Sequence, residues 1–210
     1  MTTIKFCGVT REEDVDVATE LGVDAIGFVL WPKSPRALTL DATAALVRRL
    51  PSSITPVGVF VRPTRQEIAD AVKVAGIRVA QAHGVDDVRP LLDAPCDVWA
   101  AISLTGDTLA IPVSMTILLD AQDDEQFGGT GRTIDWHAAR KIAAIRRVVL
   151  AGGLSPDNVA KAIEIAQPFG VDVSSGIEER PGVKNSKLMR DFVSAVRKAT
   201  PEGEDRRAAL

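Results

Sequence analysis

The sequence predicts a single (β/α)8 barrel of the α/β class, and three observations point to that fold. The chain has 210 residues, enough for one domain with a sizeable core. Short runs rich in Val, Ile, Leu and Ala alternate with longer amphipathic runs almost to the C-terminus. The short runs do not alternate with polar residues, which is typical of parallel strands buried on both faces. Eight such units fit a barrel at the small end of its size range.

Eight segments are predicted as strands because β-branched and aliphatic residues are dense in them. They are 4–7, 25–30, 56–61, 79–83, 98–103, 116–120, 148–151 and 171–174. An open doubly wound sheet is the alternative arrangement. That fold often has a glycine-rich fingerprint after its first strand. This chain has Cys7, Gly8, Val9 and Thr10 there instead, so the barrel is favoured.

Seven amphipathic segments are predicted as helices. They are 11–21, 41–50, 64–74, 86–92, 136–145, 156–166 and 186–198. Thr64 with Glu67 forms a capping-box pattern, and Gly76 is a C-terminal stop signal. Ser155 followed by Pro156 is typical of a helix N-terminus.

The fifth helix of the barrel is predicted to be short or missing. Between the strands 98–103 and 116–120 lie Gly106, Pro112 and few helix formers. We expect residues 1–200 to form the catalytic barrel domain and the charged tail 201–210 to be frayed.

Composition and charge disfavour several classes of protein. The net charge is −3 and the basic residues are scattered, so no nucleic-acid partner is expected. No apolar run approaches the ~18 residues that span a bilayer, and no signal peptide is apparent. Two cysteines do not make a disulfide framework, and free thiols in the cytoplasm are expected. His83 and His137 lie far apart and no cluster has ligand spacing, so no metal site is predicted.

Two strand ends carry acid–base candidates, because the active face of a barrel lies at the carboxyl ends of its strands. Cys7 ends the first strand, beside a glycine. A free cysteine is usually a small core residue. At this position, a thiol that is partly ionised can act as a base. Asp120 ends the sixth strand, where it is either a turn-former or a general acid with a raised pKa.

The ends of the seventh and eighth strands predict a phosphate site. Gly152, Gly153, Ser175 and Gly176 follow those strands, and barrels frequently bind phosphate there. Small residues let backbone N–H groups approach an anion, and a helix N-terminus near Ser175 would add its dipole. The alternative is that these glycines only turn the chain.

Other polar residues are assigned to the pocket with open roles. Arg36 is either a solvated loop charge or binds a substrate carboxylate in a bidentate fork. His83, at the end of the fourth strand, is either a satisfied polar group or a site residue. Gly129, in a glycine-rich loop, and Asp172, in the eighth strand, complete the predicted pocket. Cys96 precedes a strand and is interpreted as structural.

Motifs across almost the whole chain resemble the phosphoribosylanthranilate isomerase family of tryptophan biosynthesis. They are residues 5–10 (KFCGVT), 27–36 (GFVLWPKSPR), 81–84 (QAHG), 118–120 (LLD), 127–136 (FGGTGRTIDW), 150–158 (LAGGLSPDN), 171–178 (VDVSSGIE) and 181–182 (PG). The chain departs from the family pattern at Asn185, where Asp is common, and at Leu30-Trp31, where another aromatic pattern is usual.

The resemblance implies a barrel that catalyses an Amadori rearrangement of a phosphosugar, without metal or redox cofactor. It implies that Cys7 is the general base and Asp120 the general acid. It also implies that Arg36 holds the anthranilate carboxylate and that the backbone around Gly152, Gly153, Ser175 and Gly176 holds the phosphate. A monomer or a homodimer would both fit.

Two other functions are weighed against this one. The related aminoimidazole ribonucleotide isomerase of histidine biosynthesis, or a dual-substrate version, places an aspartate where this chain has Cys7. It also has a second phosphate loop in its first half, and none is seen here. A non-catalytic phosphosugar-binding barrel would have lost the acid–base pair, whereas Cys7 and Asp120 are both present.

Overall fold

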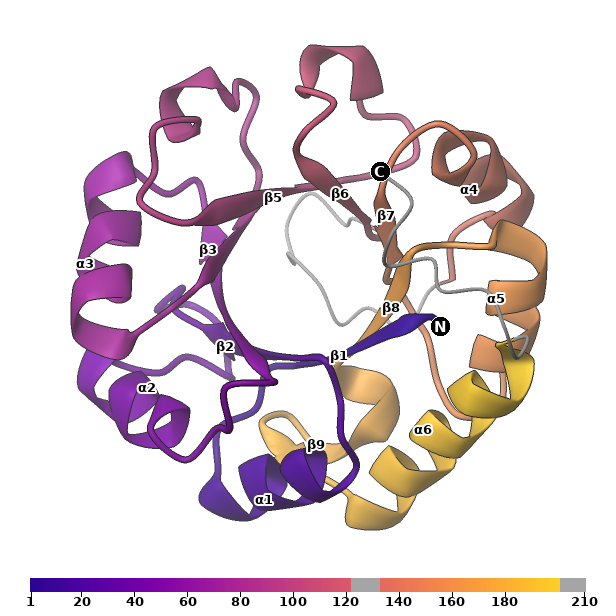
Figure 1. Ribbon diagram of the computed structural model, residues 1–210, viewed down its shortest axis with the longest axis horizontal. Helices are drawn as coiled ribbons and strands as arrows, with labels where there is room; N and C mark the ends of the chain where they lie inside the picture. Colours follow the sequence, from indigo (N-terminus) through magenta and orange to yellow (C-terminus); the bar gives the residue numbers. More distant parts are fainter. Residues whose placement is uncertain (122–132, 201–210) are drawn as a thin grey trace.

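Eight parallel strands close into a barrel in chain order, as the sequence predicts (Figure 1). The computed structural model describes residues 1–121 and 133–200. The predicted tail 201–210 and the predicted pocket residue Gly129 lie outside the described residues. The strands are β1 (Thr3–Cys7), β2 (Ala25–Val29), β3 (Thr55–Val61), β4 (Val79–His83), β5 (Asp97–Ile102), β6 (Thr116–Leu119), β7 (Val148–Leu150) and β8 (Gly170–Val173). All eight predictions are confirmed, each boundary to within one residue.

The α-helices form an outer ring around the strands (Figure 1). They are α1 (Glu12–Glu20), α2 (Leu40–Val47), α3 (Arg65–Ala75), α4 (Trp136–Ala143), α5 (Val159–Ala166) and α6 (Ser186–Ala199). The predicted capping box of Thr64 and Glu67 and the left-handed stop at Gly76 are both present on α3. Between β5 and β6 only a 3₁₀ turn, η2 (Thr108–Ala110), is found, which confirms the missing fifth helix.

Two helix predictions need correction. Segment 86–92 contains only a 3₁₀ turn, η1 (Arg89–Leu91), because Pro90 has no N–H to donate and the connection to β5 is short. Helix α5 begins at Val159 rather than at Pro156. The Asn158 side chain accepts from the Ser155 N–H and donates to the Gly153 carbonyl, both at 2.9 Å, and this holds the intervening residues in a turn.

A small hairpin after β8 was not predicted. Its strands are β9 (Glu178–Arg180) and β10 (Val183–Lys184), which pair antiparallel. Asn185 then caps α6, because its Oδ1 accepts from the N–H groups of Lys187 and Leu188 at 2.9 and 3.1 Å. Asparagine at this position therefore makes a complete N-cap.

Arg146 secures the chain where helices are missing. It is buried, and its guanidinium donates to the carbonyls of Thr108 and Pro112 at 2.7 and 2.8 Å and of Met115 at 3.5 Å. One charged group thus satisfies carbonyls that a helix would otherwise have bonded.

The strands bury both faces. Outward-facing residues pack under the helices in one large cluster, whereas inward-facing Ala25, Val57 and Val79 fill the barrel beside Trp99. Within the described residues, no helix is long and apolar enough to cross a membrane.

Candidate active site

Cys7 and Asp120 lie at the same end of the barrel. Cys7 is the last residue of β1 and Asp120 directly follows β6, so both belong to the carboxyl ends of the strands. Each has only 7% of its surface exposed. The thiol packs beside Val29, Val59 and the partly buried Trp31. The two predicted acid–base residues therefore lie at one mouth of the barrel, as the strand pattern requires.

Burial prepares Asp120 to hold a proton. Desolvation and the nearby negative charge of Asp172 raise its pKa from 3.8 to about 6, although the Ala121 N–H and Lys5 oppose the shift. A carboxyl group with such a pKa stays partly protonated near neutral pH. It can then deliver a proton to a substrate oxygen.

The Cys7 thiol is subject to opposing influences. Burial raises its pKa above the ordinary value, and Asp172 adds to this effect. The positive charges of Lys5 and Lys184 act in the opposite direction. In the free protein the thiol form is therefore favoured, and the thiolate is the minor form that could remove a proton.

A buried ion pair lies between these two residues. Lys5 is fully buried inside the barrel, and its Nζ donates to Asp172 Oδ1 at 2.8 Å. Lys5 was not predicted as a site residue. The signal was present, because Lys5 stands two residues before Cys7 in a strand and so faces the same side. Asp172 was assigned to the pocket, and the structure buries it there.

Arg36 is held by the carboxylate of Glu178, which was not predicted as a site residue either. Its Nε and Nη2 donate to the two carboxylate oxygens of Glu178 at 2.9 and 2.6 Å. Lys184 donates to the same carboxylate at 2.7 Å and to the Cys7 carbonyl at 2.6 Å. Burial alone would raise the pKa of Glu178, but the two cations outweigh burial and lower it. One edge of the Arg36 guanidinium is therefore already occupied by protein.

The loops after β7 and β8 interlock. Gly152 has a φ of 78°, and a Cβ there would come within 2.7 Å of the Ala121 nitrogen. A Cβ on Gly176 would overlap the carbonyl oxygen of Leu154. Both positions therefore require glycine. Ser175 begins only a three-residue 3₁₀ turn, η3 (Ser175–Ile177), so the helix dipole expected there is small.

These loops leave main-chain donors unused. Among the hydrogen bonds of the described residues, none is donated by the N–H of Gly152 or Gly153. Gly152, Gly153, Ser175 and Gly176 are all partly exposed. The four predicted phosphate-binding residues thus lie together at the same mouth as Cys7 and Asp120.

His83 is a neutral, buried side chain. Burial and the Lys5 charge lower its pKa to about 4. Its Nε2 lies 2.7 Å from Nε2 of the Gln81 side-chain amide, within hydrogen-bond distance. Within the described part of the chain, neither His83 Nδ1 nor Gln81 Oε1 has a hydrogen-bond partner. An imidazole in this state can donate a hydrogen bond but is a poor acid at neutral pH.

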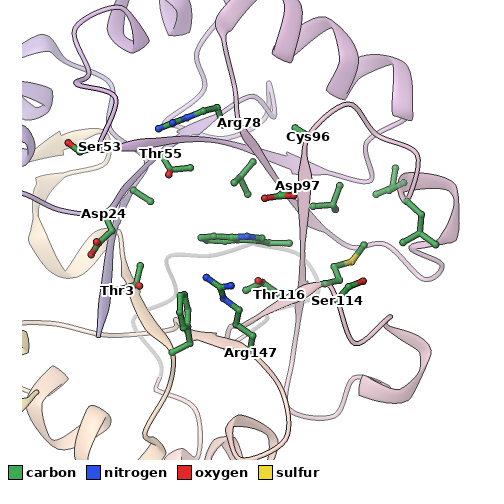
Figure 2. Close-up of a pocket in the computed structure, with 18 residues that line it drawn as sticks. Thr3, Asp24, Ser53, Thr55, Arg78, Cys96, Asp97, Ser114, Thr116 and Arg147 are labelled. Atoms are coloured by element: carbon green, nitrogen blue, oxygen red, sulfur yellow. The ribbon is translucent and has the colours of Figure 1, made fainter. Parts of the chain in front are cut away.

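A separate cavity of about 710 Å³ lies at the opposite mouth of the barrel. Figure 2 shows its polar lining, which includes Thr3, Thr55, Asp97 and Arg147 at the starts of strands. Cys96 also lines it, as expected for a cysteine that precedes a strand. The acid–base residues are not among its lining. Among the described residues, no group of three or more His, Cys, Asp or Glu side chains could hold a metal ion.

The fold and the buried carboxyl and thiol at one strand-end mouth define an acid–base enzyme of the (β/α)8-barrel class. Comparisons with known proteins specify it further. The family model for N-(5'-phosphoribosyl)anthranilate (PRA) isomerase matches residues 4–195. The N-(5'-phosphoribosyl)anthranilate isomerase of Methylibium petroleiphilum is 42% identical over 205 residues, covering 94% of this chain and 95% of that protein.

Solved structures agree. The crystal structure of phosphoribosyl anthranilate isomerase from Thermotoga maritima has a TM-score of 0.85 at 31% identity, covering 94% of this chain and 100% of that one. Phosphoribosyl anthranilate isomerase in complex with reduced 1-(o-carboxyphenylamino)-1-deoxyribulose 5-phosphate has a TM-score of 0.81 at 30% identity, with the same coverage. The chain belongs to the N-(5'-phosphoribosyl)anthranilate isomerase family.

Proposed function

We propose that Cys7 and Asp120 carry out the Amadori rearrangement of N-(5-phosphoribosyl)anthranilate to 1-(2-carboxyphenylamino)-1-deoxyribulose 5-phosphate. The observation that carries the proposal is the burial of a carboxyl group with a raised pKa and of a thiol at the same mouth of the barrel. Family membership supplies the reaction, and this geometry supplies the groups that perform it.

Asp120 acts first, as the general acid. Opening the furanose ring requires a proton on the ring oxygen, and a protonated carboxyl group can deliver it. With a pKa of about 6, roughly a tenth of Asp120 is protonated at pH 7. The nitrogen lone pair then forms the C1–N double bond as the ring C–O bond breaks, which gives an iminium.

Cys7 acts second, as the general base. The iminium acidifies the proton on the second carbon of the sugar, and the thiolate removes it. The electron pair left on carbon neutralises the iminium and forms an enolamine, which tautomerises to the ketose. Acid–base groups of this kind contribute about 10²–10⁴-fold each.

The remaining groups hold the substrate. Arg36 keeps Nη1 for the anthranilate carboxylate, since Nε and Nη2 bond to Glu178 and, in the described chain, no hydrogen bond from Nη1 is seen. The main-chain N–H groups around Gly152 and Gly176 receive the phosphate. His83 Nδ1, which has no hydrogen-bond partner among the described residues, bonds to a substrate oxygen. A monomer or a homodimer fits this arrangement. The two free cysteines support a location in the reducing cytoplasm.

Complementation tests the proposal. A strain that lacks this tryptophan-pathway step should grow without tryptophan when it expresses the chain. Cys7→Ala and Asp120→Asn should abolish growth, whereas Cys96→Ala, at the opposite mouth, should retain it. Growth with either catalytic variant would exclude these roles. The unmodified chain in a strain lacking the aminoimidazole ribonucleotide isomerase step tests for a second substrate, and we expect no growth there.

A further inference from the structure

Two charges inside the barrel have no part in the mechanism described so far. Lys5 Nζ and Asp172 Oδ1 lie 2.8 Å apart, and both side chains are buried. Buried ion pairs are costly to desolvate and are weak evidence for stability by themselves. The pair lies inside the barrel, with Lys5 two residues before Cys7 on β1 and Asp172 in register with Lys5 on β8.

The pair is oriented with respect to the two catalytic residues. Lys5 and Cys7 are on the same strand and face the same side. A Cβ placed on Gly27 would lie 3.0 Å from both Lys5 Nζ and Cys7 Sγ, so these two atoms flank one glycine. The ammonium is thus the end of the pair that approaches the sulfur.

The carboxylate end lies toward Asp120. Around the barrel the order is β1, β8, β7, β6, and Lys5 pairs in register with Asp172 of β8. Leu150 of β7 pairs with both Leu119 and Val171. Asp120 directly follows Leu119, and Asp172 directly follows Val171. The two carboxylates therefore stand at one level of the barrel. On β7, which lies between these two strands, the residue at that level is the small Ala151.

We propose that Lys5 and Asp172 are positioning residues that separate the proton affinities of the catalytic pair, Lys5 favouring the Cys7 thiolate and Asp172 favouring protonated Asp120. The proposal rests on the proposed function, and it gives Asp172 a specific role. The reaction needs the Cys7 thiolate and protonated Asp120 at the same time, although each is the minor form near neutral pH. A single positive charge would favour the thiolate but oppose the protonated acid, and a single negative charge would do the reverse. An ion pair aligned between the two residues favours both.

The charged neighbours of Cys7 and Asp120 act in the directions that this orientation requires. Among the described residues, the charged groups that act on Cys7 are Lys5, Asp172, Lys184 and Arg36, and those that act on Asp120 are Asp172 and Lys5. Lys5 is the strongest influence that lowers the pKa of Cys7. After burial, Asp172 is the strongest influence that raises the pKa of Asp120.

The test removes the pair and follows the two protonations separately. In a Cys96→Ala background, the double variant Lys5→Met/Asp172→Asn is neutral and similar in size. The ultraviolet absorbance of the Cys7 thiolate is titrated against pH, and kcat/KM is measured across the same range. We expect the thiolate midpoint to rise and the acidic limb of kcat/KM to fall, each by about one pH unit, because one nearby charge shifts a pKa by that order. Each shift lowers the fraction of one required form about tenfold, so kcat/KM should fall about 100-fold at pH values between the acidic and alkaline limbs of its profile.

Controls separate this role from a structural one. The exposed pair Glu20 and Arg190 is removed in Glu20→Gln/Arg190→Met, which should leave both midpoints in place. If the double variant fails to fold, Asp172→Asn alone retains an oxygen that accepts from Lys5. In that variant the titration midpoint of the Cys7 thiolate and the acidic limb of kcat/KM should both move to lower pH, because the negative charge of Asp172 is lost.

Unmoved midpoints, even with a lower melting temperature, would overturn the proposal and leave the pair as a core element. The thiolate titration does not depend on turnover. Active Cys7→Ala enzyme would therefore defeat the proposed function, while the titration would still decide whether the pair controls the thiol.

Discussion

Asp120 should destabilise the folded protein at the pH where it works. Its pKa rises from 3.8 to about 6 on folding, so the folded state binds this proton more tightly than the unfolded state does. A carboxyl group of this kind contributes most stability below its unfolded pKa, and the contribution is lost as the pH rises through its folded pKa. The variant Asp120→Asn, which cannot ionise, should not suffer this loss.

The size of the effect follows from the shift. A difference of about two pKa units corresponds to about 3 kcal/mol at pH 8, where the group is ionised in both states. At pH 4.5, where the unfolded chain is only partly ionised, the same shift corresponds to about 1 kcal/mol. The stability of Asp120→Asn relative to the parent protein should therefore increase by about 2 kcal/mol between pH 4.5 and pH 8.

Urea unfolding of both proteins across this pH range measures the effect. The pH-dependent part of the difference isolates Asp120, because all other groups are common to both proteins. Asp86→Asn, which removes an exposed carboxylate near η1, is the matched control and should follow the parent protein. A difference between parent and Asp120→Asn that is constant with pH, or that decreases as the pH rises, would refute the assignment of a raised pKa to this carboxyl group.

Four further outcomes are expected. Arg36→Met should raise KM and lower kcat/KM by about 10- to 150-fold, the loss of a charge-assisted pair worth about 1.5–3 kcal/mol, and an unchanged KM would place the carboxylate elsewhere. Arg146→Met should lower the free energy of unfolding in urea by about 2–4 kcal/mol, because three carbonyls lose their donor, and a loss below about 1 kcal/mol would contradict the bracing role. Gly176→Ala should weaken competitive inhibition by inorganic phosphate at least tenfold, since the added Cβ separates the two loops, and undiminished inhibition would show that phosphate binds elsewhere. The pH profile of kcat/KM should be bell-shaped, with an acidic limb near pH 6 from Asp120 and an alkaline limb above the ordinary cysteine pKa from Cys7. A flat profile across pH 5–9 would indicate another catalytic pair or slow product release.

Prediction from the sequence was most accurate for the strands and least accurate for short connections. Strand segments were found because burial on both faces selects continuous aliphatic runs, and this constraint is written into the local sequence. The segment 86–92 has helical periodicity but forms only η1, since seven residues with Pro90 among them cannot complete a stable helix. The hairpin of β9 and β10 was missed because its strands are only three and two residues long.

The site residues also fall into those that could be predicted from the sequence and those that could not. Cys7, Asp120 and the glycine loops could be placed from sequence, because their position at strand ends determines which mouth of the barrel they occupy. The partner of Arg36 could not, since Glu178 is 142 residues away along the chain. Lys5 and Asp172 are 167 residues apart and meet only because β8 closes against β1.

The sequence by itself therefore determined the alternation of strands and helices, the missing fifth helix and the residues that end each strand. These features depend on local patterns of burial and on backbone preferences. The tertiary structure alone decided which charges are paired, which pKa values are shifted and which edge of Arg36 is left for a ligand. Those properties depend on distances across the closed barrel and on the exclusion of water from its interior, and neither is encoded in any single segment of the chain.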